Sequence, residues 1–237
     1  MNKFYNSNNT VLAPISELTD AIVADLEGRT LLPRGSALIT TTGVLAPDIT
    51  AIAHAATGTM NSYFPTQSYY EPSLQSVEDS IYGCIEICKS NGNKRIAIPY
   101  IGGRIFKQRI FKGQSMSEEE KDSRLVAAIV KSTINSCNST GCDYCFIAFD
   151  DQAHSLFSSE LTRSYSAVDQ SVHLMKGDIT DFHLHHCDAI VNAANMEVLF
   201  GGGISGAIAS ATQDRIAIDK VASAAIKSFW TEYKKVR

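Results

Sequence analysis

Short apolar segments alternate with segments of helical period along most of the chain, and this alternation restricts the possible folds most. Near-continuous apolar runs are typical of strands covered on both faces. Apolar residues recur every three or four positions in 74–88 and 125–133, the latter after a Ser117 to Glu120 capping box. Strands that alternate with helices predict an α/β fold with a largely parallel or mixed sheet. The expected strands are SALIT (36–40), ITAIAHAA (49–56), KRIAIPYI (94–101), DYCFIAF (143–149), SVHLMKG (171–177) and DAIVNAA (188–194).

Composition is ordinary for a globular protein. The 237 residues are 44% hydrophobic and 19% charged, with a formal net charge of −4, which predicts no general attraction to nucleic acid or to an anionic membrane. No apolar stretch reaches the length of a membrane span and the N-terminus lacks a signal-peptide pattern, so we expect a cytoplasmic protein. The six cysteines are expected to be free thiols, and no pattern predicts a cofactor or a metal.

Two glycine-containing segments follow predicted strands. They are YIGGRIFK after KRIAIP and NMEVLFGGGISG after DAIVNAA. Glycine lets backbone amides approach a ligand, and successive amides at a helix start bind anions. The pair therefore predicts a phosphate or nucleotide site, the alternative being structural turns. Neither segment matches the Walker pattern or G-x-G-x-x-G, which disfavours the common nucleotide-binding folds.

The segments KGDIT (176–180), DAIVNAAN (188–195) and GGGISGAI (201–208) closely resemble the opening half of a macrodomain, the ADP-ribose-binding module. Segments similar to the rest of that family come earlier in the chain: LPRGSALITTTGVLAPDITAIAHAATG (32–58), RIAIPYIGGRIF (95–106) and CFIAFDDQAHSLF (145–157). The resemblance covers most of 17–212.

The reversed order of the two halves suggests a circularly permuted macrodomain. Residues 1–162 would correspond to the C-terminal part of the family and 171–237 to its N-terminal part, joined through a connector near 162–170 in a single domain, 1–237. The implied fold is a three-layer α/β/α sandwich with a central mixed sheet. A chain cut across two tandem macrodomains is the alternative; permutation needs only one short connector.

The resemblance also implies a ligand, ADP-ribose or an ADP-ribosylated protein, and a set of site residues. Asp178 would accept a hydrogen bond from the adenine amino group beside the Ile179 amide, and Asn195 would hold the distal ribose. The backbone around the distal ribose and diphosphate would come from Gly201, Gly202, Gly203, Ile204 and Ser205. The second loop would close over the phosphates with Gly102, Gly103, Arg104 and Ile105, and Phe106 would pack against the distal ribose.

The residue at position 205 leaves the reaction open. The hydrolases of the family resemble GGGVDGAIH, whereas this chain has Ser205 for the aspartate and Ala209 for the histidine. Serine is not a base at neutral pH without an activating partner. The alternatives are hydrolysis at the distal ribose C1″, with Asn195 as the candidate catalytic residue, a non-catalytic reader of ADP-ribose, and a scaffold with a degenerate pocket.

The remaining cysteines, histidines and aromatic residues receive structural interpretations. The spacing CNSTGCDYC (137–145) fits no strong zinc pattern, so we interpret the cysteines as buried thiols. His54 is expected to pack in the core, and His183, His185 and His186 to be solvated. The C-terminal helix is expected to dock on the domain through Phe229, Trp230 and Tyr233.

Overall fold

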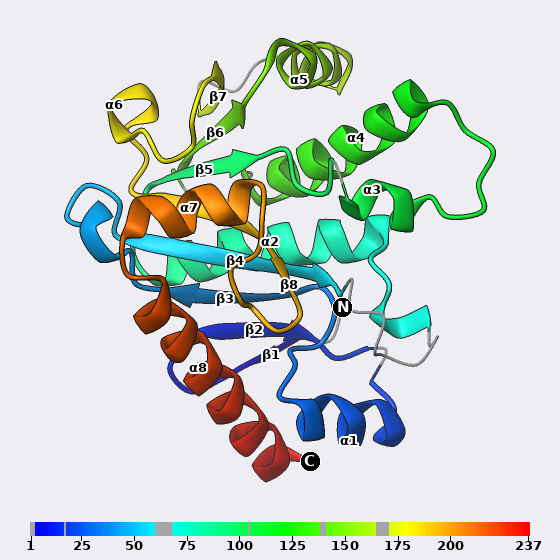
Figure 1. Ribbon diagram of the computed structural model, residues 1–237, viewed down its shortest axis with the longest axis vertical. Coiled ribbons are helices and arrows are strands. Elements are labelled where there is room, and N and C mark those ends of the chain that lie inside the picture. Colours follow the sequence, from blue (N-terminus) through cyan, green and yellow to red (C-terminus); the bar gives the residue numbers. More distant parts are fainter. Residues whose placement is uncertain (1–2, 17, 60–67, 104, 138–140, 165–170) are drawn as a thin grey trace.

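The computed structural model describes residues 3–16, 18–59, 68–103, 105–137, 141–164 and 171–237. It is an α/β protein with a central mixed sheet of eight strands (Figure 1). The strands are β1 (Lys3–Tyr5), β2 (Val11–Pro14), β3 (Ser36–Thr40), β4 (Ala51–Gly58), β5 (Arg95–Pro99), β6 (Asp143–Ala148), β7 (Val172–Lys176) and β8 (Ala189–Asn195). All six strands expected from the sequence are confirmed; the first two, β1 and β2, were not expected.

The strand order is β1-β2-β3-β4-β8-β5-β6-β7. The strands β1 to β4 form antiparallel pairs with one another, whereas β4, β8, β5, β6 and β7 run parallel. The last strand in sequence, β8, therefore lies in the middle of the sheet. Both of its neighbours come from the N-terminal part of the chain, so 1–164 and 171–237 share one sheet.

Asp188 fixes the start of β8 against both neighbours. Its carboxylate accepts hydrogen bonds from the backbone N–H of Lys94 and Arg95, at 2.9 Å and 3.1 Å for the nearer oxygens. Its carbonyl oxygen accepts from Thr50 N–H at 2.8 Å. One residue thus joins the amino-terminal ends of β4, β8 and β5. This contact sets the register of β8, and a shift of that register by one residue would move every β8 side chain to the opposite face of the sheet.

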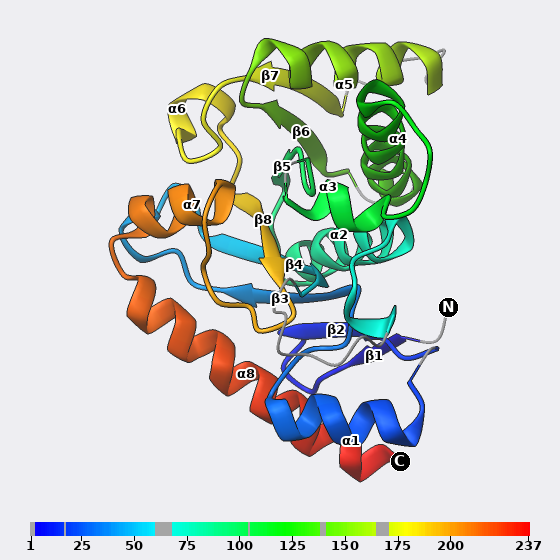
Figure 2. The same ribbon diagram turned by 45° about the vertical axis from the view of Figure 1, so that its right-hand side comes forward.

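Helices cover both faces of the sheet. Figure 2 shows α2 and α4 on one side of it and α7 and α8 on the other. The helices are α1 (Asp20–Arg29), α2 (Leu74–Ser90), α3 (Ile105–Ile110), α4 (Glu118–Cys137), α5 (Asp151–Ser164), α6 (Phe182–His185), α7 (Ile204–Thr212) and α8 (Arg215–Val236), with short 3-10 turns η1 (Gly43–Leu45) and η2 (Ser68–Tyr70). Ser117 caps α4 by accepting from Glu120 N–H at 3.1 Å, as predicted. Within the described ranges, no helix combines the length and apolar character needed to cross a membrane.

The strand β4 shows how one sheet supports two hydrophobic layers. Ala51, Ala53 and Ala55 face the core formed with α2 and α4. Ile52 faces the opposite side, in a cluster that includes Ile208 of α7. Because alternate side chains point to opposite faces, a strand buried on both sides must be apolar throughout, which accounts for the continuous apolar runs.

The C-terminal helix α8 docks on the domain, as expected from its amphipathic sequence. Phe229, Trp230 and Tyr233 are buried in a cluster that includes Leu31 and Leu38. The indole Nε1 of Trp230 donates a hydrogen bond to the Leu31 carbonyl oxygen at 2.9 Å. Helix α8 is therefore part of the core on this face.

Replacing Trp230 with alanine should lower the free energy of unfolding by about 3–5 kcal/mol, because the change opens a cavity and leaves the Leu31 carbonyl unpaired. Urea denaturation followed by circular dichroism measures this. Val236 lies on the same helix and is 70% exposed, so Val236→Ala is the matched control, with an expected change within about 0.5 kcal/mol. Equal stabilities of the two variants would contradict the docking of α8.

Candidate ligand-binding site

The predicted site residues follow parallel strands that end at the same edge of the sheet. Asn195 ends β8, the second glycine loop follows β5, and Asp178 follows β7. In open α/β sheets, ligands bind outside the carboxyl ends of the strands. The order β8-β5-β6-β7 places three strand spacings between Asn195 and Asp178, or roughly 14 Å at about 4.8 Å per strand.

The glycine loop after β8 leads into the N-terminus of α7. Gly203 is the N-cap residue with φ of 61°, in the region that favours glycine. Gly201, Gly202 and Gly203 are exposed. Among the described residues, the backbone N–H groups of Gly202, Gly203, Ile204 and Ser205 have no acceptor. Four consecutive free amides at a helix N-terminus form a cradle for an anion.

Asn195 stands at the base of this loop. Its Oδ1 accepts a hydrogen bond from Leu199 N–H at 3.3 Å, and its carbonyl oxygen accepts from Val198 N–H at 3.1 Å. Its Nδ2 group has no acceptor among the described residues. The side chain thus shapes the turn with its oxygen and keeps a donor for a ligand.

A buried chain of polar side chains lies beneath the glycine loop. Nε2 of His54 contacts Thr40 Oγ1 at 2.8 Å, and Nδ1 contacts Nδ2 of Asn192 at 3.0 Å. The same Nδ2 donates to Ser205 Oγ at 3.4 Å, and Ser205 Oγ also accepts from Gly201 N–H at 3.2 Å. Asn192 Oδ1 has no partner among the described residues. Asn192 therefore braces the loop through Ser205.

His54 is 1% exposed. Burial lowers the pKa of its imidazole from 6.5 to about 3, because an imidazolium would lose its hydration. The ring also packs against Phe200, with centroids 5.5 Å apart. His54 is neutral at physiological pH and part of the packing, consistent with the structural role predicted for it.

Helix α8 fixes the residue before the three glycines. Asp219 Oδ1 accepts a hydrogen bond from Phe200 N–H at 3.2 Å, and the Arg215 guanidinium donates to the Phe200 carbonyl oxygen at 2.6 Å. The Phe200 side chain is buried. The glycine loop therefore begins at an anchored residue, Phe200. The three glycines that follow it are exposed.

The second glycine loop is packed more tightly than the first. Gly102 has φ of 81°, and a Cβ on Gly103 would lie 2.4 Å from the Tyr100 ring. These positions require glycine because of the turn and the close ring. Arg104 lies outside the described residues, and of Ile105 the structure describes only the backbone at the start of α3. Phe106 is partly buried against the main core. Part of the ring that was expected to pack against the distal ribose therefore packs against the protein.

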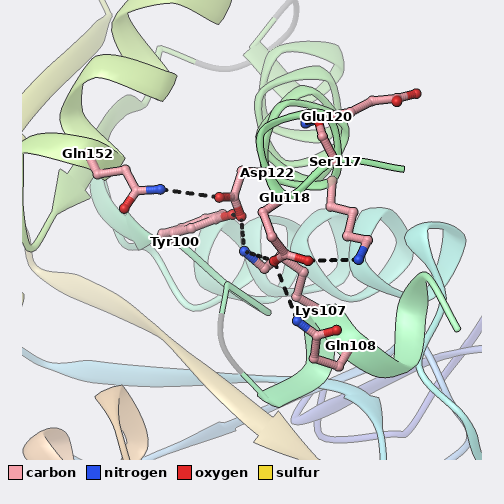
Figure 3. A network of polar contacts seen from close by, with 9 residues as sticks. Tyr100, Lys107, Gln108, Ser117, Glu118, Glu120, Asp122 and Gln152 are labelled. Carbon is pink, nitrogen blue, oxygen red and sulfur yellow. Dashed lines mark hydrogen bonds and ion pairs between the residues drawn. The ribbon is translucent and has the colours of Figure 1, made fainter. Parts of the chain in front are cut away.

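A polar network anchors this second loop (Figure 3). The carboxylate of Asp122 accepts hydrogen bonds from Tyr100 Oη and Lys107 Nζ, both at 2.6 Å, and from Gln152 Nε2 at 3.3 Å. Lys107 also contacts Glu118 at 3.1 Å. Burial, with the Asp122 hydrogen bond, raises the pKa of Tyr100. Lys107 is thus engaged within the protein and is not a free cation for a phosphate.

Asp178 forms a local turn after β7. Its Oδ1 accepts from Thr180 N–H at 2.9 Å and from Thr180 Oγ1 at 2.8 Å. This is the turn role that aspartate commonly has. Asp178 is exposed, and its Oδ2 has no partner among the described residues. Ile179 is buried, and its carbonyl oxygen contacts Nε2 of His185 at 2.9 Å.

Phe149 belongs to this edge but was not among the predicted residues. It follows β6 directly, beside the end of β7, since Ala148 pairs with Lys176 and Gly177 N–H donates to the Ala148 carbonyl. It is 71% exposed, which is unusual for a phenylalanine. The available signal was an aromatic residue at a strand end, followed by two aspartates.

The expectation that His185 is solvated is wrong. His185 is fully buried, and both ring nitrogens have partners inside the protein. Nδ1 accepts a hydrogen bond from Cys187 N–H at 2.9 Å, and Nε2 contacts the Ile179 carbonyl oxygen. His183 and His186 are exposed, as predicted. The cysteines whose side chains are described are free and buried, as expected: Cys84, Cys88, Cys142, Cys145 and Cys187. In the described part of the chain, no group of three or more His, Cys, Asp or Glu residues is placed to hold a metal.

No family model matches the chain, and no solved structure matches it. An uncharacterized protein, TV0719, of Thermoplasma volcanium is 47% identical over 45 residues. That match covers 19% of this chain and 23% of the relative. The chain thus spans less than a quarter of that relative.

Because His54 stays neutral in the folded state, acidification should destabilise the protein through this residue. Between pH 6.5 and about 3 the unfolded state binds one more proton at this position, so the free energy of unfolding falls by up to about 1.4 kcal/mol per pH unit. His54→Gln should be less stable at pH 7 but should lose less stability than the parent between pH 7 and pH 5. Denaturant titrations at several pH values measure this, with the exposed His183→Gln as control; parallel curves for parent and His54→Gln would refute it.

Proposed function

We propose that this chain is a circularly permuted macrodomain that binds ADP-ribose or an ADP-ribosylated protein at the carboxyl edge of its sheet. The observation that carries the proposal is the cradle of four free backbone amides from Gly202 to Ser205 at the start of α7. Free amides at a helix N-terminus favour phosphoryl oxygens over cationic or apolar groups.

The order of groups along the edge supports a ligand with a ribose, a diphosphate and an adenine in that sequence. Asn195 at β8 offers an amide donor for ribose hydroxyls beside the cradle. Farther along, Asp178 after β7 is an exposed carboxylate, suited to an exocyclic amino group. The separation of roughly 14 Å expected from strand spacing suits an extended dinucleotide-like ligand better than a single phosphate.

Phe149 adds an aromatic surface at the adenine end. Its exposed ring follows β6, next to the strand that Asp178 follows. Aromatic faces stack on bases, and such a contact contributes about 1–3 kcal/mol per base. In this proposal Asp178 Oδ2 selects the base edge and Phe149 covers the base face.

Binding without turnover is the function that the site favours. Ser205 and Ala209 replace the acid and the imidazole of the clearest hydrolases, and His54 lies 1% exposed below the loop. Hydrolysis of the bond at the distal ribose C1″, by a mono-ADP-ribosyl hydrolase or an O-acetyl-ADP-ribose deacetylase, is the second candidate. Asn195 favours it, because its Nδ2 group can donate a hydrogen bond that positions a water or a hydroxyl.

Calorimetric titration with ADP-ribose tests the binding function. Saturable binding is expected, and Phe149→Ala should weaken it about tenfold or more through the lost base stacking. The control is Val44→Ala, an exposed apolar residue that is 58% exposed on η1, with affinity unchanged. No heat and no thermal shift with ADP-ribose would reject the proposal and leave a scaffold with a degenerate pocket.

Incubation with a mono-ADP-ribosylated protein separates reader from hydrolase. The expected result is retention of the modified protein without release of ADP-ribose. Release of ADP-ribose would establish the hydrolase instead if Asn195→Ala abolished it and Glu197→Ala preserved it. Glu197 is a half-buried residue outside the cradle. Mass spectrometry of the modified protein and of free ADP-ribose measures both outcomes.

A further inference from the structure

The hydroxyl of Ser205 has a fixed direction that follows from the buried chain beneath the glycine loop. The chain begins at Thr40, whose Oγ1 donates to the Thr41 carbonyl oxygen at 3.2 Å. A carbonyl oxygen only accepts, so the single proton of Thr40 is used there. With the Thr40 proton on the carbonyl, Nε2 of His54 is the donor in its 2.8 Å contact with Thr40 Oγ1 and carries the ring proton.

The protonation of Nε2 decides the next link. A neutral imidazole carries one ring proton, so Nδ1 of His54 is an acceptor. Asn192 must then present its amino group to Nδ1, and Nδ2 lies there at 3.0 Å. Neutrality agrees with the burial of the ring, which is 1% exposed. The direction of the hydrogen bond at Thr40 is thus consistent with the orientation of the Asn192 amide.

The second proton of the Asn192 amino group reaches Ser205 Oγ at 3.4 Å. Gly201 N–H donates to the same oxygen at 3.2 Å. A hydroxyl oxygen has two lone pairs, and these two donors occupy both. Ser205 is left with its own proton, for which the described residues provide no acceptor.

We infer that Ser205 acts in this site only as a hydrogen-bond donor, and that His54 is the positioning residue that holds it in this role through Asn192. The inference deepens the proposed function, on which it rests for the identity of the ligand. A group whose lone pairs are both occupied cannot take a proton from water, so position 205 supplies no general base. It adds a hydroxyl donor to the amide cradle, and it selects ligand oxygens that accept, as phosphoryl oxygens do.

The ring nitrogens of His54 test the direction of the chain without any ligand. Two-bond ¹H–¹⁵N correlation spectra of the labelled protein should show the neutral tautomer protonated at Nε2, unchanged from pH 7 to pH 5. A proton on Nδ1 would reverse the direction of the buried hydrogen bonds and require the opposite orientation of the Asn192 amide. This result would overturn the inference. This measurement is independent of ADP-ribose binding, so it separates failure of this inference from failure of the proposed function.

Titration of variants with ADP-ribose tests the donor role. Ser205→Ala should weaken binding about tenfold to a hundredfold, the effect of losing a hydrogen bond to a charged group. Ser210→Ala is the matched control, because Ser210 lies exposed on the same helix and bonds the Gly206 carbonyl at 3.0 Å. Unchanged affinity of Ser205→Ala, with binding by the parent, would overturn the inference.

A double-mutant cycle tests the positioning role of the chain. In Asn192→Asp the carboxylate only accepts, so the Ser205 proton turns toward it and away from the ligand. Ser205→Ala should then cause no further loss in the Asn192→Asp background, whereas two independent effects would multiply. Multiplying effects in folded variants would contradict the positioning role of the buried hydrogen-bond chain. If Asn192→Asp fails to fold, the tautomer of His54 in the parent protein decides whether the inference holds.

Discussion

The structure depends on the insertion of β8 between β4 and β5. Its register places Ala51 against Ala189 and Gly58 near Asn195, with Asp188 fixing the starting point through the backbone of Thr50, Lys94 and Arg95. The correct register brings Asn192 beside His54 and leaves Asn195 at the sheet edge. A shift by one residue would bury Asn195 on the wrong face and remove the buried chain, because side chains alternate along a strand.

The two glycine loops at this edge have different physical roles. The loop of Gly201 to Gly203 rises from an anchored Phe200, and its free amides can meet an anion. The loop of Gly102 and Gly103 packs against Tyr100, which the Asp122 network holds in place. In our proposal the first loop binds the ligand through its backbone amides. Glycine is needed for access in the first and for close packing in the second.

The sequence was a good guide to the elements and a partial guide to the site. The apolar runs located six strands because a doubly covered strand leaves no polar positions. The short strands β1 and β2 escaped detection because three or four residues carry no period. His185 was misassigned because its burial depends on the carbonyl of Ile179 and the amide of Cys187, which only the folded chain brings to it. Phe149 was missed because exposure of an aromatic residue is decided by its neighbours in space.

By itself, the sequence determined the alternation of strands and helices, the two glycine-containing loops and the residue types available for an anion. Backbone freedom of glycine and side-chain periodicity are local properties, and local properties can be read from the chain. Tertiary structure decided which groups remain free to act. Lys107 is tied to Asp122, and the lone pairs of Ser205 are occupied by Asn192 and Gly201. Hydrogen-bond partners come from distant segments, so the chemistry of position 205 is set by residues as far away in the chain as Thr40 and His54.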